Sequence, residues 1–147
     1  FPSLNLDFFL NYNIFPRHIL SSKTLWQIEG RAMRIGDTIA QQVFLPPLKV
    51  FSQKLIFGVR ICEIIETAHK RGFSYETLEG HVEKGISTFT IEQKQKSIEF
   101  VIHTCSKPGN LLSTLAGPLF SKPYQAYCTN AALNNVKQQL ENQDLNV

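Results

Sequence analysis

One short segment of the chain holds most of the side chains that could do chemistry. Between Gly72 and Gly85, the sequence places Tyr75 on a strand-like stretch and His81 and Glu83 in the glycine-bounded loop after it. A tyrosine hydroxyl can orient a polar group, and a histidine beside a glutamate can exchange protons near neutral pH. The alternative is structural: His81 and Glu83 bond the loop backbone and fix its shape. The residue types leave both interpretations open.

The sequence contains none of the common nucleotide-binding or nucleophile motifs. There is no Gly-x-Gly-x-x-Gly, no phosphate-loop lysine motif and no Gly-x-Ser-x-Gly. His81-Val82-Glu83 imitates half of a zinc deaminase motif, but the Pro-Cys-x-x-Cys half is missing. The four histidines show no metal-binding spacing. We therefore predict neither a metal site nor a cofactor.

Composition excludes several classes of protein. The 147 residues predict a single domain over 1–147, with an ordinary globular balance of 43% hydrophobic and 18% charged residues. Fifteen Lys and Arg against twelve Asp and Glu give a net charge of +3, too little for a nucleic-acid-binding surface. No run of uncharged apolar residues is long enough to predict a membrane span.

The cysteines indicate where the protein resides. Cys62, Cys105 and Cys128 are an odd number at long spacings, which fits neither a disulfide framework nor a zinc site. We interpret them as small buried hydrophobic residues in a reducing, cytoplasmic compartment.

The first third of the chain gives mixed signals. Residues 7–20 predict a short helix interrupted at Pro16. Residues 24–29 alternate in a way that favours a strand. After a turn signal at Gly36-Asp37, residues 38–45 predict a second strand, which the prolines that follow would end.

The middle of the chain predicts four consecutive strands joined by short polar turns, which favours an antiparallel meander. The expected ranges are 55–65, 73–79, 86–92 and 97–104. In the first of these, Phe57, Val59, Ile61 and Ile65 are expected on one face, and Cys62 and Ile64 on the other. Gly72 is expected in a turn that uses a positive φ.

A long helix is expected to follow, from Leu111 to about Gln139, with a kink at Gly117-Pro118 or at Pro123 and a fraying tail beyond. The element order predicts an α+β domain, in which a curved antiparallel sheet wraps around a long C-terminal helix.

Four motifs between Gly72 and Leu119 resemble motifs of the DUF1990 family of uncharacterised domains. They are Gly72-Phe73-Ser74-Tyr75-x-Thr77-Leu78-x-Gly80-His81-x-Glu83-x-Gly85, Phe89-Thr90-Ile91-Glu92, Cys105-Ser106-Lys107-Pro108 and Ala116-Gly117-Pro118-Leu119. The resemblance implies a START-like, birch-pollen-allergen-like helix-grip fold with a seven-stranded sheet. Its first strand would precede Phe1. Where the family has two acids after Gly85, this chain has Ile86 and Ser87.

The leading functional hypothesis is a binding module. A helix-grip fold leaves a cavity between sheet and helix, where a small apolar ligand with one polar end would bind. The predicted ligand-binding residues are Trp26, Phe73, Tyr75, Thr77, His81, Glu83, Phe89, Phe100 and Leu115. The alternative is that the aromatic residues among them simply fill the core.

Two further classes stay open. One is an enzyme, a hydrolase, cyclase or isomerase that uses Tyr75, His81 and Glu83. The other is an interaction subunit that buries its apolar surface in a partner or in a second copy of itself.

Overall fold

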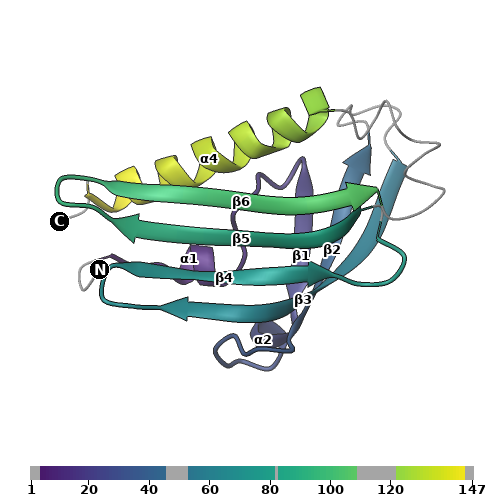
Figure 1. Ribbon diagram of the computed structural model, residues 1–147, viewed down its shortest axis with the longest axis horizontal. Helices are drawn as coiled ribbons and strands as arrows, with labels where there is room; N and C mark the ends of the chain where they lie inside the picture. Colours follow the sequence, from purple (N-terminus) through teal and green to yellow (C-terminus); the bar gives the residue numbers. More distant parts are fainter. Residues whose placement is uncertain (1–3, 46–52, 82, 109–121, 145–147) are drawn as a thin grey trace.

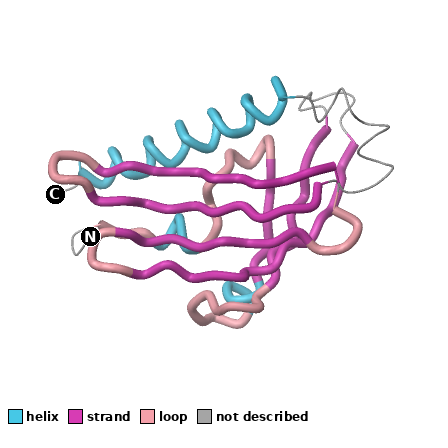
Figure 2. Tube along the Cα trace, in the orientation of Figure 1, coloured by secondary structure: helices cyan, strands magenta, loops and turns pink. Residues whose placement is uncertain are grey.

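The computed structural model describes residues 4–45, 53–81, 83–108 and 122–144. Within these residues six strands form one antiparallel sheet in chain order, from β1 at one edge to β6 at the other (Figures 1 and 2). The strands are β1 (Leu20–Thr24), β2 (Thr38–Leu45), β3 (Gln53–Glu66), β4 (Lys70–Thr77), β5 (Glu83–Gln93) and β6 (Ile98–Pro108). The helices are α1 (Asp7–Leu10), α2 (Leu25–Ile28) and α4 (Lys122–Asp144).

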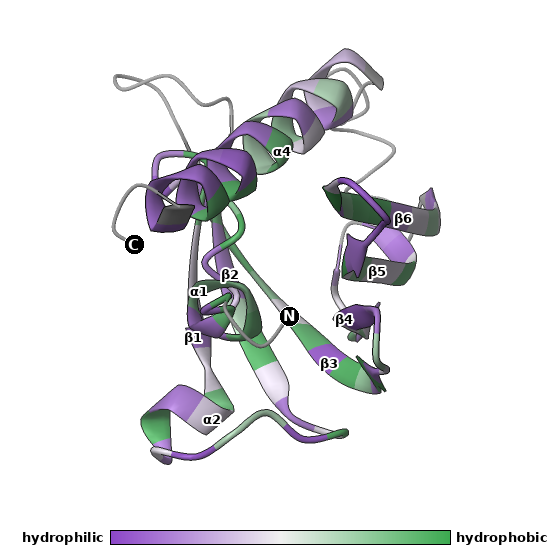
Figure 3. Cartoon of the chain, turned by 90° about the vertical axis from the view of Figure 1, so that its left-hand side faces the viewer, coloured by the Kyte–Doolittle hydropathy of each residue, from purple (hydrophilic) through white to green (hydrophobic). Residues whose placement is uncertain are grey.

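The predicted α+β class is confirmed, and so is the antiparallel meander of four strands in the middle of the chain. The strand predicted for residues 38–45 is β2. The sheet bends at β3 but is not strongly curled, with α1 on its inner side and α4 next to β6 (Figures 1 and 3). Of the seven strands that the family resemblance implies, the described residues contain six.

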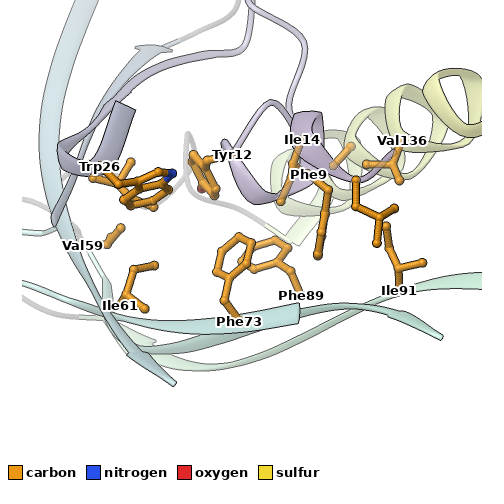
Figure 4. Close-up of a cluster of buried hydrophobic side chains, with 13 residues drawn as sticks. Phe9, Tyr12, Ile14, Trp26, Val59, Ile61, Phe73, Phe89, Ile91 and Val136 are labelled. Atoms are coloured by element: carbon orange, nitrogen blue, oxygen red, sulfur yellow. The ribbon is translucent and has the colours of Figure 1, made fainter. Parts of the chain in front are cut away.

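The core lies on the inner face of this bend, where apolar side chains gather from all parts of the chain (Figure 4). Alternate residues of β2 to β5 point inward because side chains of a strand have a period of two. The segment around α1 and two residues of α4 cover them. The fully buried members are Phe9, Tyr12, Ile14, Trp26, Ile39, Val59, Ile61, Phe73, Phe89, Ile91, Ala132 and Val136.

The face pattern predicted for β3 is wrong beyond Ile61, because a β-bulge interrupts the pairing of β3 with β4. Ile61 pairs with Tyr75, but Ile64 pairs with Phe73, so Cys62 is the extra residue. One inserted residue reverses which side chains face inward. Ile64 therefore shares the inner face with Phe73, and Ile65, which was expected there, does not.

The strand predicted for residues 24–29 is also wrong. Thr24 ends β1, and residues 25–28 form the single helical turn α2. Over four residues, an alternating pattern fits one helical turn as well as a strand. The turn buries Trp26, whose indole Nε1 donates to Asn11 at 3.2 Å, and leaves Ile28 71% exposed.

The two ends of the chain differ from expectation as well. The helix predicted for residues 7–20 is only α1, because the chain turns sharply at Tyr12, which has a φ of 62°. At the other end, α4 extends past Gln139 to Asp144, so the helix is longer than predicted, and residues 145–147 of the tail expected to fray lie outside the described residues. Pro123 lies in the first turn of α4, where proline is tolerated. The predicted start at Leu111 and the kink at Gly117-Pro118 lie outside the described residues.

The cysteines are less buried than predicted. Cys62 and Cys128 are half-buried, whereas Cys105 on β6 is exposed, because it pairs with the exposed Ile86 on the outward face of the sheet. The three thiols are free. None of the described helices is long and apolar enough to cross a membrane.

Gly72 is required for close strand packing, not for a positive φ as predicted. It lies in β4 with a negative φ, and a Cβ atom there would lie 2.2 Å from the carbonyl oxygen of Phe89 on β5. Gly58 on β3 is different, since its Cβ would meet only the end of the Leu78 side chain, at 3.0 Å.

We predict that Gly72→Ala lowers the free energy of unfolding by about 1–3 kcal/mol, because the β5 backbone must move away. Gly58→Ala is the matched control, with an expected loss below about 1 kcal/mol, because a side-chain end can rotate aside. Urea denaturation of both variants measures the difference. Equal stability of the two would contradict the packing assigned to Gly72.

Candidate functional site

Tyr75 lies on the inner face of the sheet, within the aromatic cluster. Its ring centroid is 6.0 Å from that of Tyr12 and 5.4 Å from that of Phe89. Tyr12 accepts a hydrogen bond from Gln41 Nε2 at 2.7 Å. Burial, together with the neighbouring Tyr75, holds the pKa of Tyr12 well above its usual value. These two tyrosines and Gln41 are thus a polar group within an otherwise apolar core.

Thr77, at the end of β4, contributes its hydroxyl to the backbone of the next strand. Its Oγ1 accepts a hydrogen bond from the Gly85 N–H at 3.0 Å. This bond ties the end of β4 to the start of β5 and so closes the loop between them.

His81 lies in that loop, against the ring of Phe57, with ring centroids 4.8 Å apart. Its Nδ1 accepts a hydrogen bond from the backbone N–H of Glu83 at 3.0 Å. Burial lowers the pKa of the imidazole below its usual value, against the opposing effect of Glu83. The imidazole is therefore neutral near pH 7, and its Nδ1 holds the loop by accepting the Glu83 N–H.

The Glu83 carboxylate connects three elements. It accepts hydrogen bonds from Ser106 Oγ on β6, at 3.1 Å, and from Gln125 Nε2 on α4. These contacts are the ones expected if His81 and Glu83 fix the shape of the loop. That the two residues perform chemistry stays a prediction.

Of the aromatic residues predicted to line a cavity, Phe73 and Phe89 pack within the aromatic cluster, whereas Trp26 lines a hollow of about 430 Å³ beside α1 and the ends of β3 and β4. Trp26, Phe73 and Phe89 are fully buried, and the rings of Phe73 and Phe89 stack with centroids 5.6 Å apart. Phe100 is half-buried and meets Phe9 edge-on at 5.9 Å. Leu115 lies outside the described residues. The centre of the sheet's inner face is therefore filled.

A hollow is found further along, between the β5–β6 turn and the C-terminal half of α4. Its volume is about 690 Å³. It is lined by Leu4, residues 93–98, Phe100, Leu133, Asn134, Lys137, Leu140 and Glu141. We call it the helix hollow, since it lies where the family resemblance implied a cavity between sheet and helix.

Three lysines and one glutamate stand among the lining residues of the helix hollow. Lys94 pairs with Glu92 at 2.9 Å, and Lys137 with Glu141 at 3.7 Å. Among the described residues no carboxylate lies within salt-bridge distance of Lys96. The hollow thus combines an apolar wall with an uncompensated positive charge.

The resemblance implied a cavity between sheet and helix, and Phe100, one of the predicted ligand-binding residues, lines the helix hollow. Sequence reasoning missed the lysines of its polar wall, because that wall looked like an ordinary turn. Residues 93–97 read as a polar connection between two strands, and a lysine in a turn is normally solvated. The one available signal was the repeated Lys-Gln pattern beside the apolar residue Ile98. In the part of the chain that the structure describes, no group of three His, Cys, Asp or Glu side chains could hold a metal ion.

Comparison with known proteins gives one match. A family model described as "Domain of unknown function (DUF1990)" matches residues 10–135, which is most of the chain. Neither the curated proteins nor the solved structures contain a match.

We predict that His81 makes stability depend on pH. The pKa of His81 in the folded state is lowered from the unfolded value of about 6.5. Its contribution to the stability of the fold is therefore complete above about pH 6.5 and is lost as the pH falls through the folded pKa. Thermal melts should therefore show that, from about pH 7.5 to about pH 5, the melting temperature falls less for His81→Asn than for the parent protein. The asparagine keeps an acceptor for the Glu83 N–H.

His103→Asn is the control for this measurement, since His103 is exposed on β6 and its replacement should leave the parent's drop in place. An equal drop for His81→Asn and the parent would show that protonation of His81 is not linked to folding.

Proposed function

This chain belongs to the DUF1990 family, whose function is unknown, and on that premise we propose that it is a binding module for a small amphipathic molecule with an apolar body and one anionic end. The observation that carries the proposal is the helix hollow, an open volume of about 690 Å³ between the sheet and α4. Pockets that hold small molecules have volumes of roughly 300–1,000 Å³.

The wall of the helix hollow supports an apolar ligand body. Ile98 is 42% exposed there, and Phe100, Leu133 and Leu140 are only half-buried. Covering such surface releases about 25 cal/mol for each Å² removed from water. A chain-like or ring-like apolar body lying against these side chains would gain that energy without displacing any protein group.

The charge at the rim supports an anionic end. Lys96 lies in the β5–β6 turn, exposed, and Lys94 and Lys137 are already paired with glutamates. A ligand carboxylate near Lys96 would meet a cation that has no competing partner among the described residues. A fatty acid combines the two required features.

We also propose that the fold is of the START-like helix-grip type. A meander of antiparallel strands followed by a long C-terminal helix supports this, as does a hollow between the two. The contacts of Tyr75, His81 and Glu83 give less support to an enzyme. Tyr75 contacts the aromatic cluster, whereas the other two contact loop backbone, β6 and α4.

Titration calorimetry with dodecanoate below its micelle concentration tests the proposal. We expect Ile98→Ser to weaken binding about tenfold, since it removes apolar wall. Ile86→Ser is the matched control, because Ile86 is similarly exposed, at 48%, but faces outward on β5. We expect this control to bind as the parent does.

Lys96→Gln tests the anionic end in the same assay. The expected loss is about threefold and shrinks at high salt, as for an exposed charge pair. Lys84→Gln, an exposed lysine on β5, is its control and should bind normally. No measurable binding of dodecanoate, or equal losses in variant and control, would count against the proposed function.

A further inference from the structure

A second hollow lies at the opposite edge of the sheet, around β1. Its volume is about 440 Å³. It is lined by Tyr12, Asn13, Phe15, Arg17, residues 20–23, residues 40–42 and Ile56. We call it the edge hollow, since β1 and β6 are the two edge strands of the sheet (Figure 1).

Gln41 is the unusual residue of the edge hollow. Its side chain is only 3% exposed, and its Nε2 donates to the Tyr12 hydroxyl. The amide oxygen receives no hydrogen bond from the described residues. No fully buried side-chain polar atom among them lacks a partner, so this oxygen keeps some solvent exposure, and Gln41 lines the hollow. A buried acceptor of this kind favours a ligand that brings a donor.

In the structure, the nitrogen of the Gln41 amide faces Tyr12. A φ of 62° is unfavourable for a bulky residue, and the packing of its ring against Phe73 and Phe89 maintains it. The tyrosine hydroxyl thereby holds the amide nitrogen on the core side. The amide oxygen is left as a rigid, preorganised acceptor.

A hydroxyl group and one cation share the hollow with this acceptor. Ser22 pairs with Gln41 across β1 and β2, so both side chains lie on the same face of the sheet. Arg17 lines the hollow, and within the described ranges no carboxylate lies within salt-bridge distance of it. Lys23, next to Ser22 on β1, points to the other face of the sheet. The ring of Phe15, 6.1 Å from that of Tyr12, supplies an apolar wall.

We propose that the edge hollow is a second binding site, which takes a small organic acid that carries a hydroxyl group. The hydroxyl donates to Gln41 Oε1, the carboxylate interacts with Arg17, and the body of the molecule packs against Phe15. This site is separate from the helix hollow and does not depend on the function proposed for it.

Three probes test the site on the unmodified protein: 4-hydroxybenzoate, benzoate, which lacks the hydroxyl, and phenol, which lacks the carboxylate. Titrations followed by NMR should give an affinity for 4-hydroxybenzoate about fivefold higher than for either analogue, as expected for one added hydrogen bond or charge contact. Benzoate binding as tightly as 4-hydroxybenzoate would overturn the proposal.

Variants locate the binding. The exposed cation is removed in Arg17→Gln, which should bind 4-hydroxybenzoate no better than the parent binds phenol. Lys84→Gln, with one exposed lysine of β5 replaced, is the control and should bind normally. Gln41→Leu should bind 4-hydroxybenzoate and benzoate equally. If Gln41→Leu does not fold, the probe series and the cation variant decide the question.

Ile98→Ser distinguishes the two hollows. It should leave the affinity for 4-hydroxybenzoate unchanged, because Ile98 lines only the helix hollow. Loss of 4-hydroxybenzoate binding in Ile98→Ser, or normal binding in Arg17→Gln, would place the probe elsewhere and overturn the assignment.

Discussion

The insertion of Tyr12 into the inner face of the sheet is the contact on which the rest of the structure depends. Its ring meets Phe73 and Phe89 at 6.1 and 6.2 Å, and its hydroxyl binds Gln41 on β2. One side chain thus joins the N-terminal segment to both halves of the bent sheet. The unfavourable backbone conformation at Tyr12 is the cost of this arrangement, and the burial of several aromatic rings offsets it.

Filling the centre of the inner face decides where a ligand can bind. The aromatic cluster fills the space between the middle of β4 and β5 and the α1 segment, so open volume remains only around it. It is found at the two edges of the sheet, and beside Trp26 between α1 and the ends of β3 and β4. At the β6 edge, α4 packs inward through Ala132 and Val136, while Leu133 and Lys137, each one position further along, line the helix hollow. Helical spacing therefore lets one helix both complete the core and form the wall of a pocket.

The loop of His81 and Glu83 illustrates how reactive residue types can serve structure. The imidazole accepts a backbone N–H, and the carboxylate joins β5 to β6 and α4. Each polar group thereby finds a partner where burial would otherwise be unfavourable. The Gln41 amide differs from these, because half of its hydrogen-bonding capacity is directed at a hollow.

The sequence by itself determined the family, the α+β class and the order of the strands, because period-two alternation and short polar turns are local properties. It did not determine the bulge at Cys62 or the helical turn at Trp26, where a few residues fit two conformations equally well. Whether the aromatic residues line a cavity or fill the core was decided only by tertiary structure. That outcome rests on contacts such as Tyr12 with Gln41, 29 residues apart, and Glu83 with Gln125, 42 residues apart. No local pattern encodes the distance between such segments, since it depends on how the whole sheet bends.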